Sequence, residues 1–390
     1  MNTTETYLYL TACALNGMPA AAEQIDFDAL WALAQGHNLT ALIAKALANA
    51  EAFCRADEKE RFRWNNALNN NVKKTMLFGA ERKKLIAFFE ENGIWYLPLK
   101  GAVINGLYPS YGTREFADND ILIDASRCGD TKEYLLRHGY ELRSDEFNSD
   151  EYSKPPFYNF EIHRTLAKKT LGREALYDYY KDVKSRLLPA NGAKYGYRFS
   201  DEDFYIYFIF HAFKHYDSRG TGFRTVADEY VLLKRGKLSP DFSRVEQVLK
   251  TLGLLEFERT LRGLAEKLLS APERLEQNLE RLTQDEREML RFILSCSTFG
   301  SMDNMFQKEF ERLAEGKDFS KRQYYLKRIF PPISSYQYTN PFVYRHKLVY
   351  PFFLAYRLAV NPIRHRKYLK EERKAIKKLD QKSKSGNNVN

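Results

Sequence analysis

Cysteine is scarce in this sequence, which has only four among its 390 residues. Cys13, Cys54, Cys128 and Cys296 lie far apart and form no CxxC pair. Disulfide frameworks need patterned, paired cysteines, and zinc ribbons need CxxC pairs. The sequence therefore supports neither kind of scaffold, and its cysteine usage is typical of a protein from a reducing compartment.

Long apolar runs are missing as well. The first residues, MNTTETYLYLTACALNGM, contain Glu5 and no basic stretch, so they do not resemble a secretion signal. A membrane-spanning helix needs about 20 apolar residues in a row. The best candidate, residues 342–360, is interrupted by basic side chains (Arg345, His346, Lys347 and Arg357). We therefore expect a cytoplasmic protein.

The body of the chain has little excess of either charge, although the net charge is +10. Residues 361–390 hold ten Lys and Arg against three acidic residues, which accounts for +7 of that total. A basic tail is a local feature. The net charge therefore does not indicate that the body binds nucleic acid.

What the chain does have is helical periodicity on both sides of a segment with strand character. Apolar residues recur at helical spacing over residues 1–90 and again over 187–330. Within 91–186, IWYLPLKG, DNDILID and FYNFEIH are predicted strands separated by helical segments, which favours a small α/β or α+β domain. Residues 331–390 combine an aromatic segment with a basic tail that we expect to be partly disordered.

The strand DNDILID contains the first candidate site. Residues two apart on a strand lie on the same face, so Asp118 and Asp120 can converge on one cation. Carboxylate oxygens are ligands that suit Mg²⁺ or Mn²⁺. A lone DxD motif is more simply explained as a solvated strand start, so a second acidic element is needed to favour a metal site.

The strand FYNFEIH contains that second element. Glu161 and His163 share one face with Asn159, while the other face is apolar. If this strand lies beside DNDILID, then Glu161 completes a cluster of three carboxylates, which would repel one another without a cation. We therefore predict that Asp118, Asp120 and Glu161 bind metal and carry the catalytic chemistry, as an in-line displacement at phosphorus requires.

Basic and glycine residues at turns are the candidate phosphate ligands. Lys100-Gly101 lies where a strand leads into a helix, and such a turn lets backbone N–H groups approach an anion. Arg114, four residues before the DxD motif, is a second candidate. Taken singly, each of these is a common surface feature.

The order of these motifs resembles a known family. LKGAVINGLYP, then Arg114 and DNDILID, then NFEIHRTL, HAFKHY and FRTVADEYVLL are similar to the uncharacterised nucleotidyltransferases of the NTP_transf_5 type, in the polymerase-β-like superfamily. The resemblance covers about residues 20–270. It implies an α+β fold, with a small mixed β-sheet core flanked by N-terminal and C-terminal helical regions. It also implies that Asp118, Asp120 and Glu161 are the acidic site residues.

Further residues of the same motifs are candidates for a supporting role near the cleft. His211 and His215 lie four apart on a predicted helix, but no HExxH glutamate or clear third ligand accompanies them. We interpret them, with His163, Arg224 and Asp228, as supporting residues instead of a second metal site. The stripe DFYIYFIF is interpreted as core.

Two functions follow as hypotheses. The first is a metal-dependent transfer of a nucleoside monophosphate from an NTP to an unknown hydroxyl-type acceptor, which is a small molecule, a protein or an RNA end. The alternative is a catalytically silent binding protein of the same fold. For either function, residues 342–384 are a candidate for binding an anionic membrane surface, on the inner face of the membrane. The other interpretation of this segment is a C-terminal helix that packs on the body and has a solvated basic end.

Overall fold

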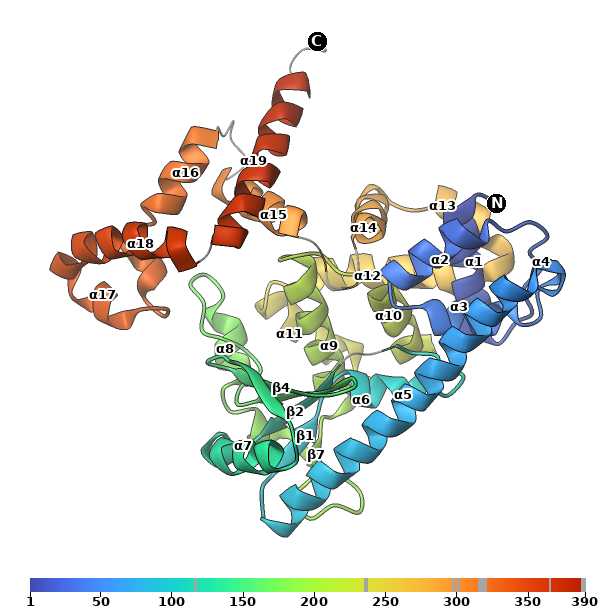
Figure 1. Ribbon diagram of the computed structural model, residues 1–390, viewed down its shortest axis with the longest axis horizontal. Helices are drawn as coiled ribbons and strands as arrows, with labels where there is room; N and C mark the ends of the chain where they lie inside the picture. Colours follow the sequence, from blue (N-terminus) through green and yellow to red (C-terminus); the bar gives the residue numbers. More distant parts are fainter. Residues whose placement is uncertain are drawn as a thin grey trace. The chain divides into compact units, whose positions relative to one another are not determined.

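The computed structural model describes residues 1–115, 118–234, 238–296, 298, 300, 302–314, 321–364 and 366–386 (Figure 1). The chain forms two compact units. The first comprises Met1–Lys168, Ala175–Ala212 and Gly222–Thr298, and the second comprises Lys169–Glu174, Phe213–Thr221 and Phe299–Asn390. The described part contains no helix that is both long enough and apolar enough to cross a membrane.

The first unit begins with five helices, as the periodicity predicts: α1 (Thr3–Asn16), α2 (Phe27–Gly36), α3 (Thr40–Leu47), α4 (Glu51–Arg55) and α5 (Glu58–Glu91). Asp57 caps α5 by accepting a hydrogen bond from the backbone N–H of Glu60. The helix ends just before Gly93, whose φ of +66° suits glycine. The buried residues of α5 recur about every three to four positions and form one stripe (Trp64, Asn71, Thr75, Phe78, Leu85 and Phe89).

A five-stranded mixed sheet follows, in the spatial order β1-β2-β5-β4-β3 (Figure 1). Its strands are β1 (Tyr96–Pro98), β2 (Asn119–Ile123), β3 (Glu141–Asp145), β4 (Ser149–Lys154) and β5 (Tyr158–His163). Only the central pair β2 and β5 is parallel, while the other neighbours run antiparallel. The intervening elements are α6 (Gly101–Ile104), η1 (Asn105–Leu107), η2 (Ala125–Arg127) and α7 (Cys128–Arg137). The α+β fold with a small mixed sheet is therefore confirmed.

The hairpin of β3 and β4 was not predicted from the sequence. Its strands, ELRSD and SDEYSK, are rich in Asp, Glu and Ser and contain no β-branched aliphatic residue. Asp and, to a lesser degree, Glu are depleted in strands on average. The hairpin forms because β4 pairs with the whole length of β5, so its stability comes from tertiary pairing.

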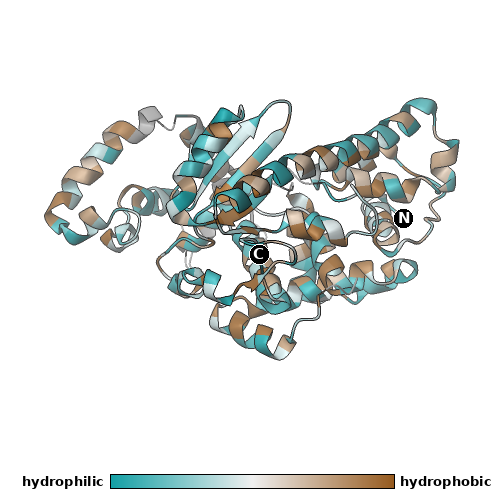
Figure 2. Cartoon of the chain, turned by 90° about the horizontal axis from the view of Figure 1, so that it is seen from below, coloured by the Kyte–Doolittle hydropathy of each residue, from teal (hydrophilic) through white to brown (hydrophobic). Residues whose placement is uncertain are grey.

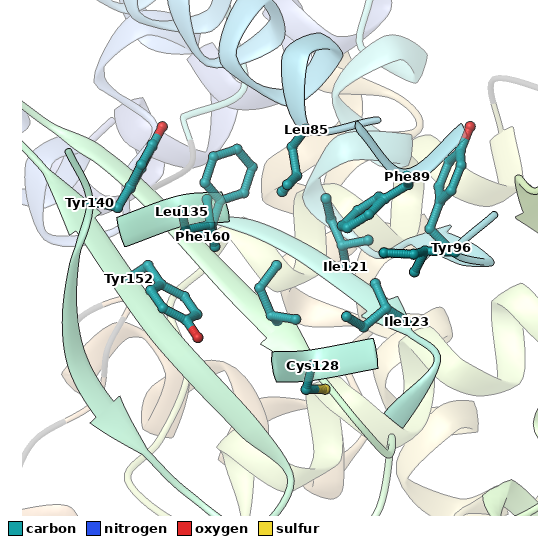
Figure 3. Close-up of a cluster of buried hydrophobic side chains, with 12 residues drawn as sticks. Leu85, Phe89, Tyr96, Ile121, Ile123, Cys128, Leu135, Tyr140, Tyr152 and Phe160 are labelled. Atoms are coloured by element: carbon teal, nitrogen blue, oxygen red, sulfur yellow. The ribbon is translucent and has the colours of Figure 1, made fainter. Parts of the chain in front are cut away.

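One face of the sheet is closed by a hydrophobic core (Figure 3). Ile121 and Ile123 of β2 and Phe160 of β5 pack there against Leu85 of α5 and Leu135 of α7. Because side chains alternate along a strand, this packing turns the even-numbered residues of β2 and the odd-numbered residues of β5 to the opposite face. The candidate carboxylates therefore lie away from the core.

The remaining elements of the polar face and of the helical region are α8 (Glu174–Tyr180), η3 (Val183–Arg186), β6 (Leu188–Pro189), β7 (Tyr197–Arg198), α9 (Asp201–Tyr216), α10 (Arg224–Lys234), α11 (Phe242–Thr251), α12 (Leu255–Leu269), η4 (Pro272–Arg274), α13 (Leu275–Glu280) and α14 (Gln284–Ser295). Helix α9 is buried along Asp203–Phe210, which is consistent with the interpretation of DFYIYFIF as core.

The second unit contains a small core of its own. It is built from α15 (Met302–Ala314), α16 (Lys321–Ile329), η5 (Ile333–Tyr336), α17 (Pro341–Arg345), η6 (Lys347–Val349), α18 (Tyr350–Arg364) and α19 (Arg366–Gly386). Phe306, Tyr324, Ala375 and Ile376 are its buried centre. The structure gives a helix up to Gly386, where the sequence suggested a disordered tail, and residues 387–390 lie outside the described range.

Candidate active site

Strands β2 and β5 bring the predicted carboxylates together. Their parallel register places Asp120 directly beside Glu161, as the sequence required of adjacent strands. Asp120 is 2% exposed through its side chain, whereas Glu161 is 31% exposed. Solvent and ligands can therefore reach Glu161 more easily than Asp120, which is enclosed by protein.

His163 and Ser149 connect these carboxylates. The Nε2 atom of His163 lies 3.0 Å from Oδ1 of Asp120 and 3.5 Å from Oε1 of Glu161. The hydroxyl of Ser149 on β4 donates a hydrogen bond to the same Oε1 atom at 2.9 Å. One ligand atom from each of Asp120, Glu161 and His163 lies within 4.8 Å of the others, so this group can hold a metal ion.

Asp118 lies beside this group without being a member of it. The negative charge of Asp120, followed by burial, raises the pKa of Asp118 to about 6. Burial also acts to raise the pKa of Asp120, but the charge of Lys100 and the hydrogen bond with His163 outweigh it and hold that pKa well below its usual range. The pair thus contains one firmly ionised carboxylate and one that binds a proton readily in the absence of a further cation.

Lys100 supplies the nearest positive charge. Its Nζ atom lies 3.3 Å from Oδ2 of Asp120, and its side chain is 18% exposed. The residue has a φ of +29°, which is uncommon for any residue except glycine, at the turn before Gly101 and α6. Although burial acts to lower the pKa of Lys100, the charges of Asp120 and Asp118 raise it above its usual value. This strained turn therefore directs an ammonium group at the acidic centre.

Arg114 is bound by Asp228 and is not directed at this centre. Its Nε and Nη2 atoms donate to the two carboxylate oxygens of Asp228, each at 2.8 Å, and the hydroxyl of Tyr108 donates to Oδ1 at 2.8 Å. All three residues are buried. Two of the predicted site residues therefore form a buried, bidentate ion pair that ties the loop before Asp118 to α10. Of the guanidinium nitrogens of Arg114, only Nη1 has no hydrogen-bond partner among the described residues, so only Nη1 could make the predicted contact with phosphate.

Two other cations lie close to Asp118. The predicted supporting residue Arg224 donates a hydrogen bond from Nη1 to the backbone oxygen of Glu115 at 2.6 Å. Burial, followed by the charge of Arg114, lowers the pKa of Arg224, while Asp118 acts in the opposite direction. Burial likewise lowers the pKa of Lys74 on α5, against the charges of Glu115 and Asp118. Lys74 was missed from the sequence because it lies on a polar helix far from every motif.

Helix α9 contributes an aromatic side chain near the carboxylates. Burial, followed by the charge of Asp120, raises the pKa of Tyr207 well above its usual value, and Glu161 adds to this effect. The sequence offered no signal for this role, since Tyr207 lies in the middle of an apolar stripe. His211 and His215 follow on the same helix, both half-buried, and within the described residues neither joins the group of potential metal ligands.

The mixed sheet, the acidic side chains on two adjacent strands, the lysine turn before α6 and the helical region agree with the nucleotidyltransferase class that the motifs suggested. The model of the family described as uncharacterised nucleotidyltransferase (NTP_transf_5) matches residues 23–270. The chain belongs to this family and is therefore an enzyme that transfers phosphorus-containing groups. No curated protein and no solved structure matches the chain.

Proposed function

We propose that this nucleotidyltransferase transfers a nucleoside monophosphate from an NTP to a hydroxyl-type acceptor and releases pyrophosphate, with Mg²⁺ or Mn²⁺ held by Asp118, Asp120 and Glu161. The observation that carries the proposal is the register of β2 and β5, which places Asp120 beside Glu161 next to a second aspartate. The raised pKa of Asp118 supports it, because a carboxylate crowded by like charge favours a cation. Such an ion supplies charge stabilisation at the phosphoryl oxygens and orients the reacting oxygens.

The protein's own residues divide the remaining work. Asp120 is held in one orientation by His163 and Lys100, so it is suited to fix a ligand geometry. Glu161 is the accessible carboxylate, so it either completes the metal ligands or accepts the proton of the acceptor hydroxyl. Both roles are compatible with the hydrogen bond from Ser149, which orients Oε1.

Phosphate binding is assigned to two cations that lack an ion-pair partner, in addition to Lys100, which already pairs with Asp120. Among the described residues, no carboxylate lies within 4.0 Å of Lys74 or Arg224, and both are partly buried beside Asp118. Buried cations are normally paired, so an unpaired set indicates a place for an anionic ligand. We propose that Lys74 and Arg224 act with Lys100 and Gly101 on the triphosphate.

This phosphate assignment has a matched test on α5. Lys74→Gln is expected to weaken NTP binding at least about tenfold, since a hydrogen bond to a charged group contributes roughly 1.5–3 kcal/mol. Lys73→Gln is the control, because Lys73 is its exposed neighbour on the same helix. Equal NTP affinity of the two variants would show that α5 does not contact the nucleotide.

The acceptor and the location of the protein remain predictions. A small molecule, a protein or an RNA end all offer the required hydroxyl. We also keep the prediction of a cytoplasmic protein, with residues 342–384 at an anionic membrane surface. The catalytically silent alternative is not favoured, because membership of an enzyme family is accompanied by intact acidic residues on both strands.

The test of the proposed function is calorimetric titration of the full chain with each NTP, in Mg²⁺ and in EDTA. We expect binding that needs the metal and that is lost in the double variant Asp118→Asn/Asp120→Asn. Asp145→Asn serves as the control, since Asp145 is an exposed aspartate at the end of the edge strand β3. Metal-independent binding that survives in the double variant would place the nucleotide elsewhere and overturn the proposal.

A further inference from the structure

The second unit exposes an unusual number of large apolar side chains over a short segment. In α17, η6 and α18, Leu348 is 89% exposed, Phe352 77%, Phe342 61%, Tyr356 56% and Leu358 49%. Single exposed apolar residues are normal on a protein surface, but a contiguous set indicates a binding surface. We call the members of this set on η6 and α18 (Leu348, Phe352, Tyr356 and Leu358), with the exposed Pro351, Ala355 and Ala359, the α18 face.

The α18 face is separate from the side of the helix that packs. Leu348, Phe352 and Tyr356 recur every four residues, so they project from one side. Phe353 lies on another side and packs edge-on against Tyr336, with ring centroids 5.1 Å apart. Arg357 also donates a hydrogen bond to the hydroxyl of Tyr336, and its guanidinium lies over the Tyr336 ring in a cation–π contact. The helix is therefore anchored in the second unit by one side while the α18 face stays open.

All charged side chains in the sequence around the α18 face are basic. No Asp or Glu occurs between Asp318 and Glu371, whereas eleven Lys and Arg do (Lys321, Arg322, Lys327, Arg328, Arg345, Lys347, Arg357, Arg364, Arg366, Lys367 and Lys370). Arg345 and Lys347 are exposed on either side of His346, next to Leu348. In the described part of the chain neither has a carboxylate within 4.0 Å. Their charges are thus available to an anionic partner.

We propose that the α18 face docks in the interfacial layer of an anionic lipid bilayer, with its apolar side chains among the acyl chains and Arg345 and Lys347 among the headgroups. An amphipathic helix with aromatic residues on one side and basic residues beside it suits this position. Each basic residue near an anionic surface adds roughly 1 kcal/mol of attraction. The left edge of Figure 2, which corresponds to α17 and α18 in Figure 1, shows this mixture of brown and teal segments.

A second copy of the chain is the weaker candidate for the partner. Self-association through the α18 face would bring two basic segments without acidic residues together, and juxtaposed like charges oppose binding. A lipid surface of negative charge has the opposite effect, since it satisfies the apolar residues and the basic residues at once. Charge complementarity therefore selects the bilayer.

The proposal differs from attachment by the basic tail alone. Helix α19 contributes Ala375 and Ile376 to the core of the second unit, so its inner side is already used. A tail acting through charge alone would lose all binding in high salt, because surface charges are screened. The α18 face predicts a remaining, salt-resistant part of the binding, since apolar burial is not screened.

The experiment is flotation of the full-length protein with vesicles of phosphatidylcholine alone or with added phosphatidylserine. We expect binding to the phosphatidylserine vesicles at physiological salt. In 0.5 M NaCl, where the Debye length is only about 4 Å, binding should be weaker but still measurable. The triple variant Leu348→Ser/Phe352→Ser/Tyr356→Ser should lose at least about 100-fold in partitioning, since each side chain removes a share of apolar burial. Phe62→Ser/Met76→Ser is the control, because both residues are similarly exposed on α5.

Two further measurements keep the outcome decisive. Phe352→Trp should show a blue shift and quenching by brominated lipid on vesicle binding, whereas Phe62→Trp should show neither. Arg345→Gln/Lys347→Gln should lower the preference for phosphatidylserine roughly tenfold or more. The proposal is overturned if the wild-type protein does not float with phosphatidylserine vesicles, if the triple variant floats equally well, or if sedimentation shows that the triple variant dissociates a dimer.

Discussion

Two groups of buried acids in the first unit show how differently carboxylates behave in one protein. At the sheet, Asp120 and Glu161 lie beside Lys100 and His163, and Glu161 remains partly exposed. In the helical region, the hydroxyl of Tyr205 lies 2.6 Å from Oε1 of Glu229 and 2.8 Å from Oε1 of Glu258. Both of these glutamates are fully buried.

The electrostatic consequences of the two groups are opposite. Burial raises the pKa of Glu229 to about 8, although the hydrogen bond from Tyr205 and the charge of Arg262 act to lower it. Arg262 instead pairs with Glu258, with its Nε atom 2.7 Å from Oε1. Glu229 is therefore protonated at neutral pH and serves packing, whereas Asp120 stays ionised. Nearby cations and access from outside, more than proximity of acids, distinguish a functional cluster from a structural one.

The largest difference is expected from removing a charge at the sheet. Asp120→Asn should lower turnover at least about 1,000-fold, because several kcal/mol of charge stabilisation are lost at roughly 1.4 kcal/mol for each factor of ten. The measurement is steady-state transfer of labelled nucleotide, with circular dichroism as a check on folding. The exposed-site variant Asp145→Asn should keep full turnover, and full turnover in Asp120→Asn would remove the distinction between the two acid groups.

Replacing the protonated glutamate of the helical group should change the pH dependence of stability and leave turnover intact. The pKa of Glu229 is raised to about 8 in the folded state, above the ordinary value of 4.5 expected when unfolded. The folded state thus binds the extra proton between these values, so stability falls with rising pH by up to about 1.4 kcal/mol per pH unit. Glu229→Gln should abolish that dependence.

Urea unfolding at pH 6 and at pH 8.5 measures the difference. Between these two pH values the wild-type protein should lose stability, whereas Glu229→Gln should not. The reason is that the unfolded wild-type chain has already released the proton of Glu229, while the folded state still binds it. Glu256→Gln, at an exposed position of α12, should follow the wild-type curve. Parallel curves for Glu229→Gln and wild type would mean that the buried glutamate keeps its ordinary pKa.

A smaller effect is expected from the residue that orients the carboxylates at the sheet. His163→Gln should weaken Mn²⁺ binding about 10–100-fold, the usual range for a hydrogen-bonding partner of a metal ligand. Calorimetry with Mn²⁺ alone reports this without any need for turnover. His138→Gln on the exposed end of α7 is the control. An unchanged Mn²⁺ affinity would assign His163 to packing only.

The smallest predicted effect is the pH dependence of metal binding by the sheet group. The pKa of Asp118 is raised to about 6, and a carboxylate must be deprotonated to bind a cation. Metal affinity should therefore be constant above pH 6 and fall by up to tenfold per pH unit below it. Asp118→Asn should bind more weakly but with a flatter pH profile, and an equally steep profile would exclude Asp118 as the titrating group.

Much of this site was visible in the sequence because its signals are local. The alternation in DNDILID and FYNFEIH separates an apolar face from a carboxylate face without any knowledge of the fold, and the structure has these faces. The end of α5 before Gly93 is equally local, since glycine has no Cβ and adopts a positive φ at little cost. Residue types at short spacing were sufficient for both.

Other features depend on contacts between distant segments. The β3–β4 hairpin is polar and forms because β5 offers an edge for pairing. Arg114 was predicted at the phosphate but is bound to Asp228, 114 positions away. Lys74 and Tyr207 come from a long polar helix and an apolar one, where nothing in the neighbouring residues distinguishes them.

The sequence by itself determined the class of fold, the two acidic strands and the family, because periodicity and motif order are properties of the linear chain. Only the tertiary structure decided which cations remain unpaired beside the acids, which acid stays open, and that an apolar face on α18 is left uncovered. Burial and charge pairing are set by whatever folds against a side chain, and a residue's own neighbours in sequence do not contain that information.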